Sequence, residues 1–380
     1  MSKVNFRRYH PGDEEGIVEL LDETFSGWPQ EEINCSSTDY WRWKYHDNPL
    51  HELLVSLGEV DGKIIGCHHR IPLKIWFKGK TLIATTAVDF AVHKDYRGQG
   101  LSYQISSVNM RAGEQHGADL SYFITSNPLL IRRYTQDRDP NKRTLRFPKR
   151  IRNMVHLHDV DLQLQKMPMS NPWVIKMGWY TLKTLNQIAN WMKPRPGKHE
   201  IIRIKEVERF DECINQFWSK MSNSYDFIVE RRMEYLNWRY CDPRLKGYKV
   251  NIALDEHEEI QGYIVYKTNN YIKDYPVGYI VDLITLNNQP GIQHCLLETA
   301  VSYFRENNVN VINYQLIEGH PHQEASKRLG FLDSRINLHL FYNKVGEFTE
   351  LEVLSHSHPS RVYISWGDHD VLPVKLPTQT

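Results

Sequence analysis

One segment of the chain reads Asp89-Phe90-Ala91-Val92-His93-Lys94-Asp95-Tyr96-Arg97-Gly98-Gln99-Gly100-Leu101-Ser102. It combines an apolar strand, a short turn, a glycine-rich loop and the start of a helix. The glycines allow the loop backbone to approach a ligand closely, and the helix N-terminus adds a partial positive charge. Such a loop is typical of a pyrophosphate cradle, so we expect a cofactor that carries phosphate groups.

Size and composition predict a globular protein of more than one domain. The chain has 380 residues, of which 41% are hydrophobic and 24% charged, and its net charge is +1. The near-neutral charge gives no overall attraction to nucleic acid or to anionic membranes. The five cysteines show no paired spacing, as is usual for reduced thiols, and we find neither a signal peptide nor a membrane-spanning run. We therefore expect a cytoplasmic location.

The sequence repeats itself. Residues 40–49 (YWRWKYHDNP) recur as residues 235–243 (YLNWRYCDP), which places Trp43 and Trp238 195 positions apart. Asp89-Phe90 is similarly echoed by Asp282-Leu283, each near the end of an apolar strand. A repeat of this length indicates a duplicated domain rather than a solenoid. We predict domains at residues 1–160 and 200–380, joined by a linker helix region over residues 161–199.

Each copy has the pattern of a mixed α/β domain. In the first copy, hydrophobic periodicity and turn residues predict an ordered series of elements. These are a strand at 4–8, a helix at 13–25, a second helix carrying the Trp-rich segment, strands near 52–58, 63–77 and 81–92, a helix at 101–116, a strand at 120–125 and a helix near 127–136.

The first copy resembles the GNAT acyltransferases. The signature of that family, [R/Q]-x-x-G-x-[G/A], is matched by residues 97–102, where Ser102 replaces the last small residue. The family's N-x-x-A-x-x-x-Y helix is matched at its first and last positions by Asn127 and Tyr134. The resemblance implies an α/β fold of two tandem GNAT-like mixed-sheet domains, with acyl-CoA bound by the first and its acyl group passed to an amine.

The resemblance also implies roles for individual residues. The expected cofactor contacts are Phe90, Val92, Arg97, Gly98, Gln99, Gly100, Leu101, Ser102 and Asn127. A backbone N–H between Phe90 and Val92 would polarise the thioester carbonyl. Tyr134 is the candidate acid that protonates the leaving thiolate, and the alternative is a buried aromatic residue. Asp89 is the candidate base, and the alternative is a structural carboxylate. No metal is expected.

Two groups of residues have competing interpretations. His68, His69 and His93 are lesser candidates for the base, since a lone histidine is more often structural. The aromatic group at 41–45 could stack on a base or a sugar. Its recurrence at Trp238 favours packing in the core.

The second copy has a degenerate CoA loop. Pro290-Gly291-Ile292-Gln293 stands where residues 97–100 stood in the first copy, so the arginine and the second glycine are absent. Proline also removes a backbone donor. Ser326 takes the place of the tyrosine. We predict that this copy does not bind CoA and contributes instead to acceptor binding; the alternative is that it only stabilises the first copy.

Tandem copies with one intact loop resemble bacterial N-acyltransferases that act on nucleotide-linked amino sugars in polysaccharide biosynthesis. The resemblance implies an acetyl or longer acyl group, such as 3-hydroxybutanoyl, and an acceptor such as a dTDP-linked amino sugar. The alternatives are an acyltransferase of an amino acid, peptide or antibiotic, a Fem-type transferase that uses aminoacyl-tRNA, and a non-catalytic binding protein. We expect small-molecule partners, no nucleic acid and no membrane, and leave the oligomeric state open.

Overall fold

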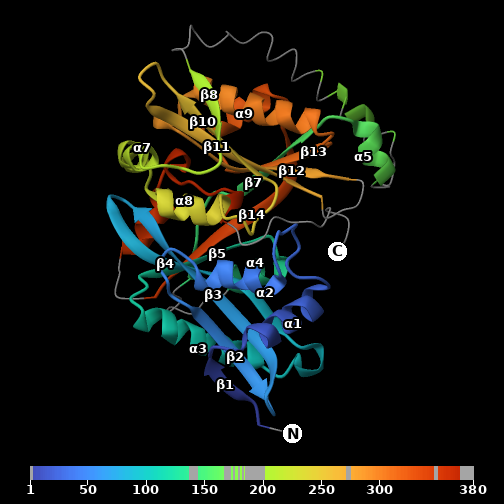
Figure 1. Cartoon of the computed structure of the whole chain (residues 1–380), viewed down its shortest axis with the longest axis vertical. Coiled ribbons are helices and arrows are strands. Elements are labelled where there is room, and N and C mark those ends of the chain that lie inside the picture. The colour runs from blue at the N-terminus through green and yellow to red at the C-terminus, as the bar shows by residue number, and fades with distance from the viewer. Residues whose placement is uncertain are drawn as a thin grey trace.

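The computed structural model describes residues 3–136, 144–166, 202–270, 275–345 and 350–368, together with seven residues from 173 to 184. The predicted linker helix region therefore lies largely outside the described residues. Within the described part, helices pack on one continuous 14-stranded sheet (Figure 1). No described helix is both long enough and apolar enough to cross a membrane.

The first half contains the predicted elements in the predicted order. They are β1 (Asn5–Arg8), α1 (Glu14–Phe25), α2 (Ser37–Trp41), β2 (Leu54–Val60), β3 (Lys63–Phe77), β4 (Lys80–Val92), α3 (Leu101–Gln115), β5 (Leu120–Thr125), α4 (Pro128–Gln136), β6 (Thr144–Arg146), β7 (Ile151–Leu157) and α5 (Val160–Lys166). The Asp61-Gly62 turn joins β2 to β3 with both residues at positive φ, as a tight hairpin turn requires.

The second half follows the same plan. Its elements are β8 (Arg203–Val207), α7 (Cys213–Met221), β9 (Phe227–Val229), α8 (Met233–Tyr240), β10 (Tyr248–Leu254), β11 (Ile260–Asn269), β12 (Val277–Thr285), α9 (Pro290–Glu306), β13 (Val311–Ile317), α10 (His322–Arg328) and β14 (Leu332–Lys344). The predicted α/β fold of two tandem units with mixed sheets is confirmed.

The two halves exchange strands. The path through the sheet is β1-β2-β3-β4-β5-β14-β7-β13-β12-β11-β10-β8. Strand β7 comes from the first half of the chain but lies among the strands of the second, while β14 runs from β7 down to β5 (Figure 1). The predicted first unit, residues 1–160, therefore contributes a strand to the sheet of the second unit, and the exchange joins the two sheets into one.

The repeated Trp segments meet at the centre of the molecule. The rings of Trp43 and Trp238 stack with centroids 5.5 Å apart. Each indole N–H donates to the backbone carbonyl of the other tryptophan, at 2.8 and 2.9 Å. Such reciprocal contacts are those of an isologous interface, here within one chain. Trp41, Trp43 and Tyr45 are all buried, so the packing interpretation of this aromatic group is confirmed.

Candidate acyl-CoA site

Strands β4 and β5 part within the first half. They pair in parallel only at residues 84–86 and 120–122, although β4 continues to Val92 and β5 to Thr125. On the other side of β4, the pairing with β3 skips Asp89 and Phe90, which form a bulge. Asp89 has a φ of 39°, an unusual value for a residue other than glycine. We call the region beyond Thr86 and Tyr122 the β4–β5 divergence.

The glycine-rich loop is open to solvent at one end of this region. Residues 97–100 are exposed, and Gly98 and Gly100 have φ values of 79° and 74°. A Cβ atom built on either glycine meets no atom within 4 Å. Gly100 precedes α3 without a side-chain cap, so N–H groups of the first turn remain available for a ligand. The arrangement is that of an unoccluded anion cradle.

The predicted cofactor contacts in the glycine-rich loop and at the start of α3 differ in their exposure. Arg97 donates from Nε to the Val92 carbonyl oxygen at 2.9 Å, which fixes the start of its side chain while the residue stays exposed. Ser102 is exposed, whereas the Leu101 side chain is buried against Ile105 and its neighbours. Leu101 can therefore offer a ligand only its backbone.

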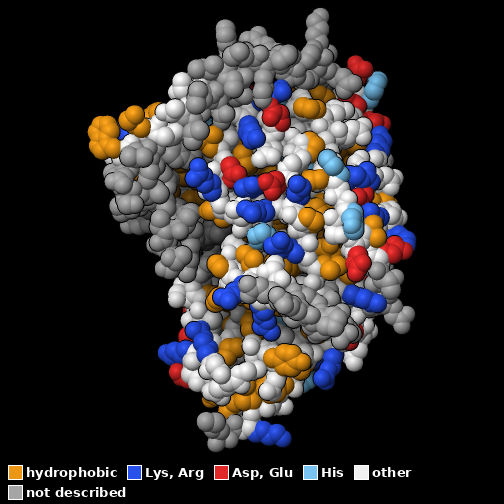
Figure 2. Space-filling model, turned by 180° about the vertical axis from the view of Figure 1, so that it is seen from behind, with side chains coloured by type: hydrophobic (Ala, Val, Ile, Leu, Met, Phe, Trp, Pro, Cys, Tyr) orange, Lys and Arg blue, Asp and Glu red, His pale blue; other side chains and the backbone are white. Residues whose placement is uncertain are grey.

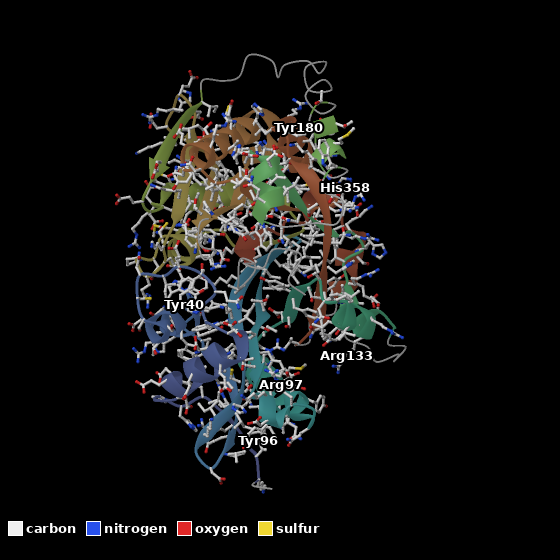
Figure 3. The ribbon with its side chains drawn as sticks, turned by 90° about the vertical axis from the view of Figure 1, so that its right-hand side faces the viewer. Tyr40, Tyr96, Arg97, Arg133, Tyr180 and His358 are labelled. Atoms are coloured by element: carbon white, nitrogen blue, oxygen red, sulfur yellow. The ribbon has the colours of Figure 1, made fainter. Side chains whose placement is uncertain are left out.

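Helix α4 brings the other two predicted residues to the same region. The side-chain oxygen of Asn127 accepts from the Leu129 N–H at 2.9 Å, so Asn127 acts as the cap of this helix. The Tyr134 ring packs on Phe123 of β5, with centroids 5.2 Å apart, and on Phe341 of β14. In Figure 3, Arg97 marks the loop before α3 and Arg133 marks α4.

Exposed apolar side chains border the divergence. Phe90, at the end of β4, is 38% exposed and Leu129, at the start of α4, is 77% exposed. Tyr103 in the first turn of α3 and Leu130 are exposed as well. These four large hydrophobic side chains lie on β4, α3 and α4, and each offers apolar surface that a ligand could cover.

Asp89 lies in a buried ion pair. Its carboxylate accepts from Lys44 Nζ at 2.7 Å and from the Tyr45 hydroxyl. Burial alone would raise the pKa of Asp89, but the Lys44 charge outweighs it and holds the pKa below its usual value. A carboxylate with a lowered pKa is a weak proton acceptor. This geometry is that of the structural alternative rather than of a free base.

The side chains of His68 and His69 also make structural contacts. His69 Nε2 accepts from the indole N–H of Trp41 at 3.0 Å, which leaves Nδ1 to donate to the Asp89 carbonyl oxygen at 2.9 Å. Burial lowers the pKa of His69 to about 4. His68 contacts Ser106 and Phe90, and burial holds its pKa well below the usual value. The pairing of Lys44 with Asp89 could not be predicted from the sequence, because the two residues are 45 positions apart.

His93 lies just before the glycine-rich loop. Its Nδ1 accepts from the Asp95 N–H at 3.3 Å and so caps the short turn that leads into the loop. Its Nε2 lies 3.4 Å from a carboxylate oxygen of Glu23. Both ring nitrogens therefore have partners on the protein, as in the structural interpretation.

The second half has the same divergence, but this chain fills it. Strands β12 and β13 pair only at residues 277–280 and 311–314, and the β11–β12 register shifts next to Asp282. The Tyr363 hydroxyl accepts from the Leu283 N–H at 2.9 Å and lies 2.8 Å from Asp282 Oδ1. Leu283 is the counterpart of Phe90, and Pro290 begins α9 in place of an open loop. The degenerate copy thus offers a ligand neither the loop nor the strand N–H.

Comparison with known proteins gives one family match. Residues 5–135 match the acetyltransferase (GNAT) domain family. The match covers about a third of the chain and lies within the first half. No curated protein sequence matches the chain.

Solved structures share the fold over most of the chain. Saccharomyces cerevisiae N-myristoyltransferase with bound myristoyl-CoA is 13% identical with a TM-score of 0.58, covering 90% of this chain and 83% of that one. A GCN5-related N-acetyltransferase from Anabaena variabilis is 11% identical with a TM-score of 0.57, covering 90% and 73%. A probable N-acyltransferase from Enterococcus faecalis is 14% identical with a TM-score of 0.56, again covering 90% and 73%. At these identities the likeness shows the fold alone.

Proposed function

We propose that this protein binds acyl-CoA along α3 and α4 of the first half and passes the acyl group to the amine of a nucleotide-linked amino sugar. The observation that carries the cofactor assignment is the contrast between the halves. The first half has an open glycine loop, an apolar rim and a bulged strand. In the second half Tyr363 occupies the corresponding position.

The proposed chemistry divides among three groups. The loop at 97–100 and the start of α3 hold the pyrophosphate, and a backbone N–H between Phe90 and Val92 stabilises the negative charge that develops on the thioester oxygen. The acceptor nitrogen forms a bond to the thioester carbon as the carbon–sulfur bond breaks. Tyr134 gives its proton to the leaving thiolate, and the proton lost by the amine passes to solvent or to the tyrosinate.

Asp89 has a positioning role in this proposal. Its paired carboxylate and its carbonyl oxygen tie the bulge of β4 to Lys44, Tyr45 and His69. The bulge is what turns the backbone of Phe90 away from the ladder with β3. Fixing the bulge would fix the direction of the proposed oxyanion donor.

The acceptor would reach the site through the joint between the halves. A small cavity there is lined by Lys44, Thr86, Tyr235, Trp238 and Arg239, among others. Thr86 ends the paired part of β4, so the cavity adjoins the divergence. Arg239 and the aromatic rings suit a nucleotide-linked sugar, whose phosphates are anionic and whose base is planar. An amine of low basicity also suits a site in which the nearby carboxylate is already paired.

A thiol-release assay tests the proposal. The purified chain is mixed with acetyl-, butyryl- or 3-hydroxybutanoyl-CoA and with nucleotide-linked amino sugars, amino acids, peptides or aminoglycosides. We expect free CoA only with an acyl-CoA and an amino sugar together. If CoA is released with amino acids or peptides but not with amino sugars, the acceptor assignment is wrong. No release with any amine would contradict the proposed function.

The aminoacyl-tRNA alternative requires a surface that attracts RNA. On the face shown in Figure 2, Lys and Arg side chains are interspersed with Asp and Glu side chains and with hydrophobic ones. Mixed charge of this kind gives little of the electrostatic attraction on which RNA binding depends. We therefore favour a small-molecule acceptor.

A further inference from the structure

Arg70 is a buried cation at the point where β4 and β5 begin to part. It is 8% exposed, and its Nη1 donates to the Ser121 hydroxyl at 2.6 Å and lies 3.2 Å from the Thr85 hydroxyl. Its Nε is buried and has no hydrogen-bond partner among the described residues. Both partners are neutral, and no carboxylate of the described chain forms an ion pair with Arg70.

Three other buried cations of this protein each contact a carboxylate. Lys44 contacts Asp89 at 2.7 Å, Arg231 contacts Asp282 at 2.8 Å, and Lys267 contacts Glu31. A buried charge without a counter-charge is costly, and proteins usually avoid it by pairing. Burial also lowers the pKa of Arg70 to about 10, in the direction expected for a charge that lacks compensation. Arg70 therefore differs from these three buried cations.

The position of Arg70 is that of the inner end of the acyl site. Arg70 pairs with Ala87, the first residue of β4 beyond its last pair with β5. Its partner Ser121 alternates with Phe123 along β5, so both point to the face on which Tyr134 packs. Thr86 and Ile71 point the opposite way, towards the cavity between the halves. Arg70 thus lies on the α4 face, where the proposed function places the acyl end of the cofactor.

We propose that Arg70 binds a carboxylate of the substrate at the inner end of the β4–β5 divergence. The proposal rests on the acyl-CoA site proposed above and names the chemistry that this site selects. A guanidinium group offers a planar fork of donors that matches a carboxylate, and Nε with one Nη forms one such fork. The carboxylate comes either from the acyl group, as in a dicarboxylic acyl-CoA, or from the acceptor, as in a nucleotide-linked amino sugar that carries a uronic carboxylate.

A carboxylate fits this place better than a phosphate of the cofactor. The phosphate cradle is the exposed loop at 97–100, beyond the far end of β4 from Arg70. Ser121 and Thr85 already use one donor nitrogen of Arg70, so the remaining donors suit a small planar group. A purely structural clamp between β3, β4 and β5 would need no charge, since a neutral donor could bridge two hydroxyls.

Isothermal titration tests the first source. The full chain is titrated with succinyl-CoA and with butyryl-CoA, which have acyl chains of equal length and differ in the terminal carboxylate. We expect the wild type to bind succinyl-CoA about tenfold to a hundredfold more tightly. Arg70→Met should remove this preference while leaving the affinity for free CoA unchanged. Arg111→Met, which removes an exposed cation of α3, should keep the preference.

Thiol release tests the second source. With acetyl-CoA as donor, a nucleotide-linked amino sugar with a uronic carboxylate and its carboxamide are compared as acceptors for the wild type, Arg70→Met and Arg111→Met. If the carboxylate belongs to the acceptor, only Arg70→Met loses the preference for the sugar that carries the carboxylate. Arg70→Lys, which keeps the charge but not the fork, should retain part of whichever preference the wild type shows.

Two outcomes overturn the proposal. The first is an equal response of wild type and Arg70→Met to carboxylate and neutral ligands in both assays, with CoA still bound. The role proposed for Arg70 would then be wrong, while the proposed cofactor site would be unaffected. The second is a lower melting temperature of ligand-free Arg70→Met without any change of ligand preference, which would make Arg70 a structural clamp. Absence of CoA binding to the wild type would instead contradict the proposed function itself.

Discussion

Two residues of the proposed site show what burial does to a charge. Asp89 has a lowered pKa because Lys44 compensates its burial, whereas Arg70 has only neutral partners among the described residues. The ion pair of Asp89 with Lys44 stabilises the fold, whereas Arg70 keeps donor groups that can bind a ligand. Neither could be predicted from the sequence, because a motif gives residue types and not the partners that folding brings near. The loop at 97–102 could be predicted, since its spacing alone carries the information.

Asp89→Asn separates a structural from a chemical role. If Asp89 is a positioning residue, the variant leaves Lys44 buried without a counter-charge, and we expect a loss of about 3–5 kcal/mol in the free energy of unfolding. Urea denaturation measures this loss. The double variant Asp89→Asn with Lys44→Met should recover part of it. A variant of unchanged stability that releases no thiol would identify Asp89 as the base.

Tyr134→Phe tests the proposed acid. The ring contacts with Phe123 and Phe341 would remain, so the fold should be preserved. Loss of the proton donor should lower kcat about a hundredfold or more, with little effect on the KM for acyl-CoA. Steady-state thiol release measures both. An unchanged kcat would leave the hydroxyl without a role in the reaction.

At the scale of elements, local sequence patterns predict the helices and strands well, but they do not predict which strands pair. The strand at 63–77 and the helix near 101–116 are found within a residue of their predicted bounds. Apolar alternation and flanking turns are local properties, so the sequence carries them. The exchange of β7 and β14 is not local, because either strand would show the same pattern in either sheet. Only packing across the joint determines which sheet each one enters.

The segment around Tyr363 closes the second divergence, and Tyr363→Phe tests that function. The change leaves the buried Leu283 N–H and the Asp282 carboxylate short of a partner. We expect a loss of about 1–3 kcal/mol in the free energy of unfolding, with unchanged affinity for CoA, because the proposed cofactor site lies in the other half. Weakened CoA binding would instead place a ligand in the second half.

At the scale of the molecule, the two halves form one structure. The largest apolar cluster contains residues from both halves, including Trp43 and Leu236. We expect residues 1–199 and 200–380, expressed apart, to be largely unfolded by circular dichroism, since β5 and β7 would each lose β14. Produced together, they should form a 1:1 complex that binds CoA. A folded monomeric first half would contradict this view of the sheet.

The internal repeat accounts for a chain with two halves of the same plan and one proposed cofactor site. The reciprocal Trp43 and Trp238 contacts are symmetric where the two halves meet. Away from the joint the copies differ, with an open loop in one and Pro290 and Tyr363 in the other. The sequence repeat predicted this asymmetry at the loop, but the filling by Tyr363 involves residues 80 positions apart and could be seen only in the folded chain.

Isothermal titration with CoA tests the central claim most directly. We predict one molecule of CoA bound per chain, with binding abolished by Arg97→Glu and retained by Arg111→Glu, a matched charge reversal on the exposed surface of α3. Two bound molecules per chain, or an Arg97→Glu variant that binds CoA as the wild type does, would contradict the claim.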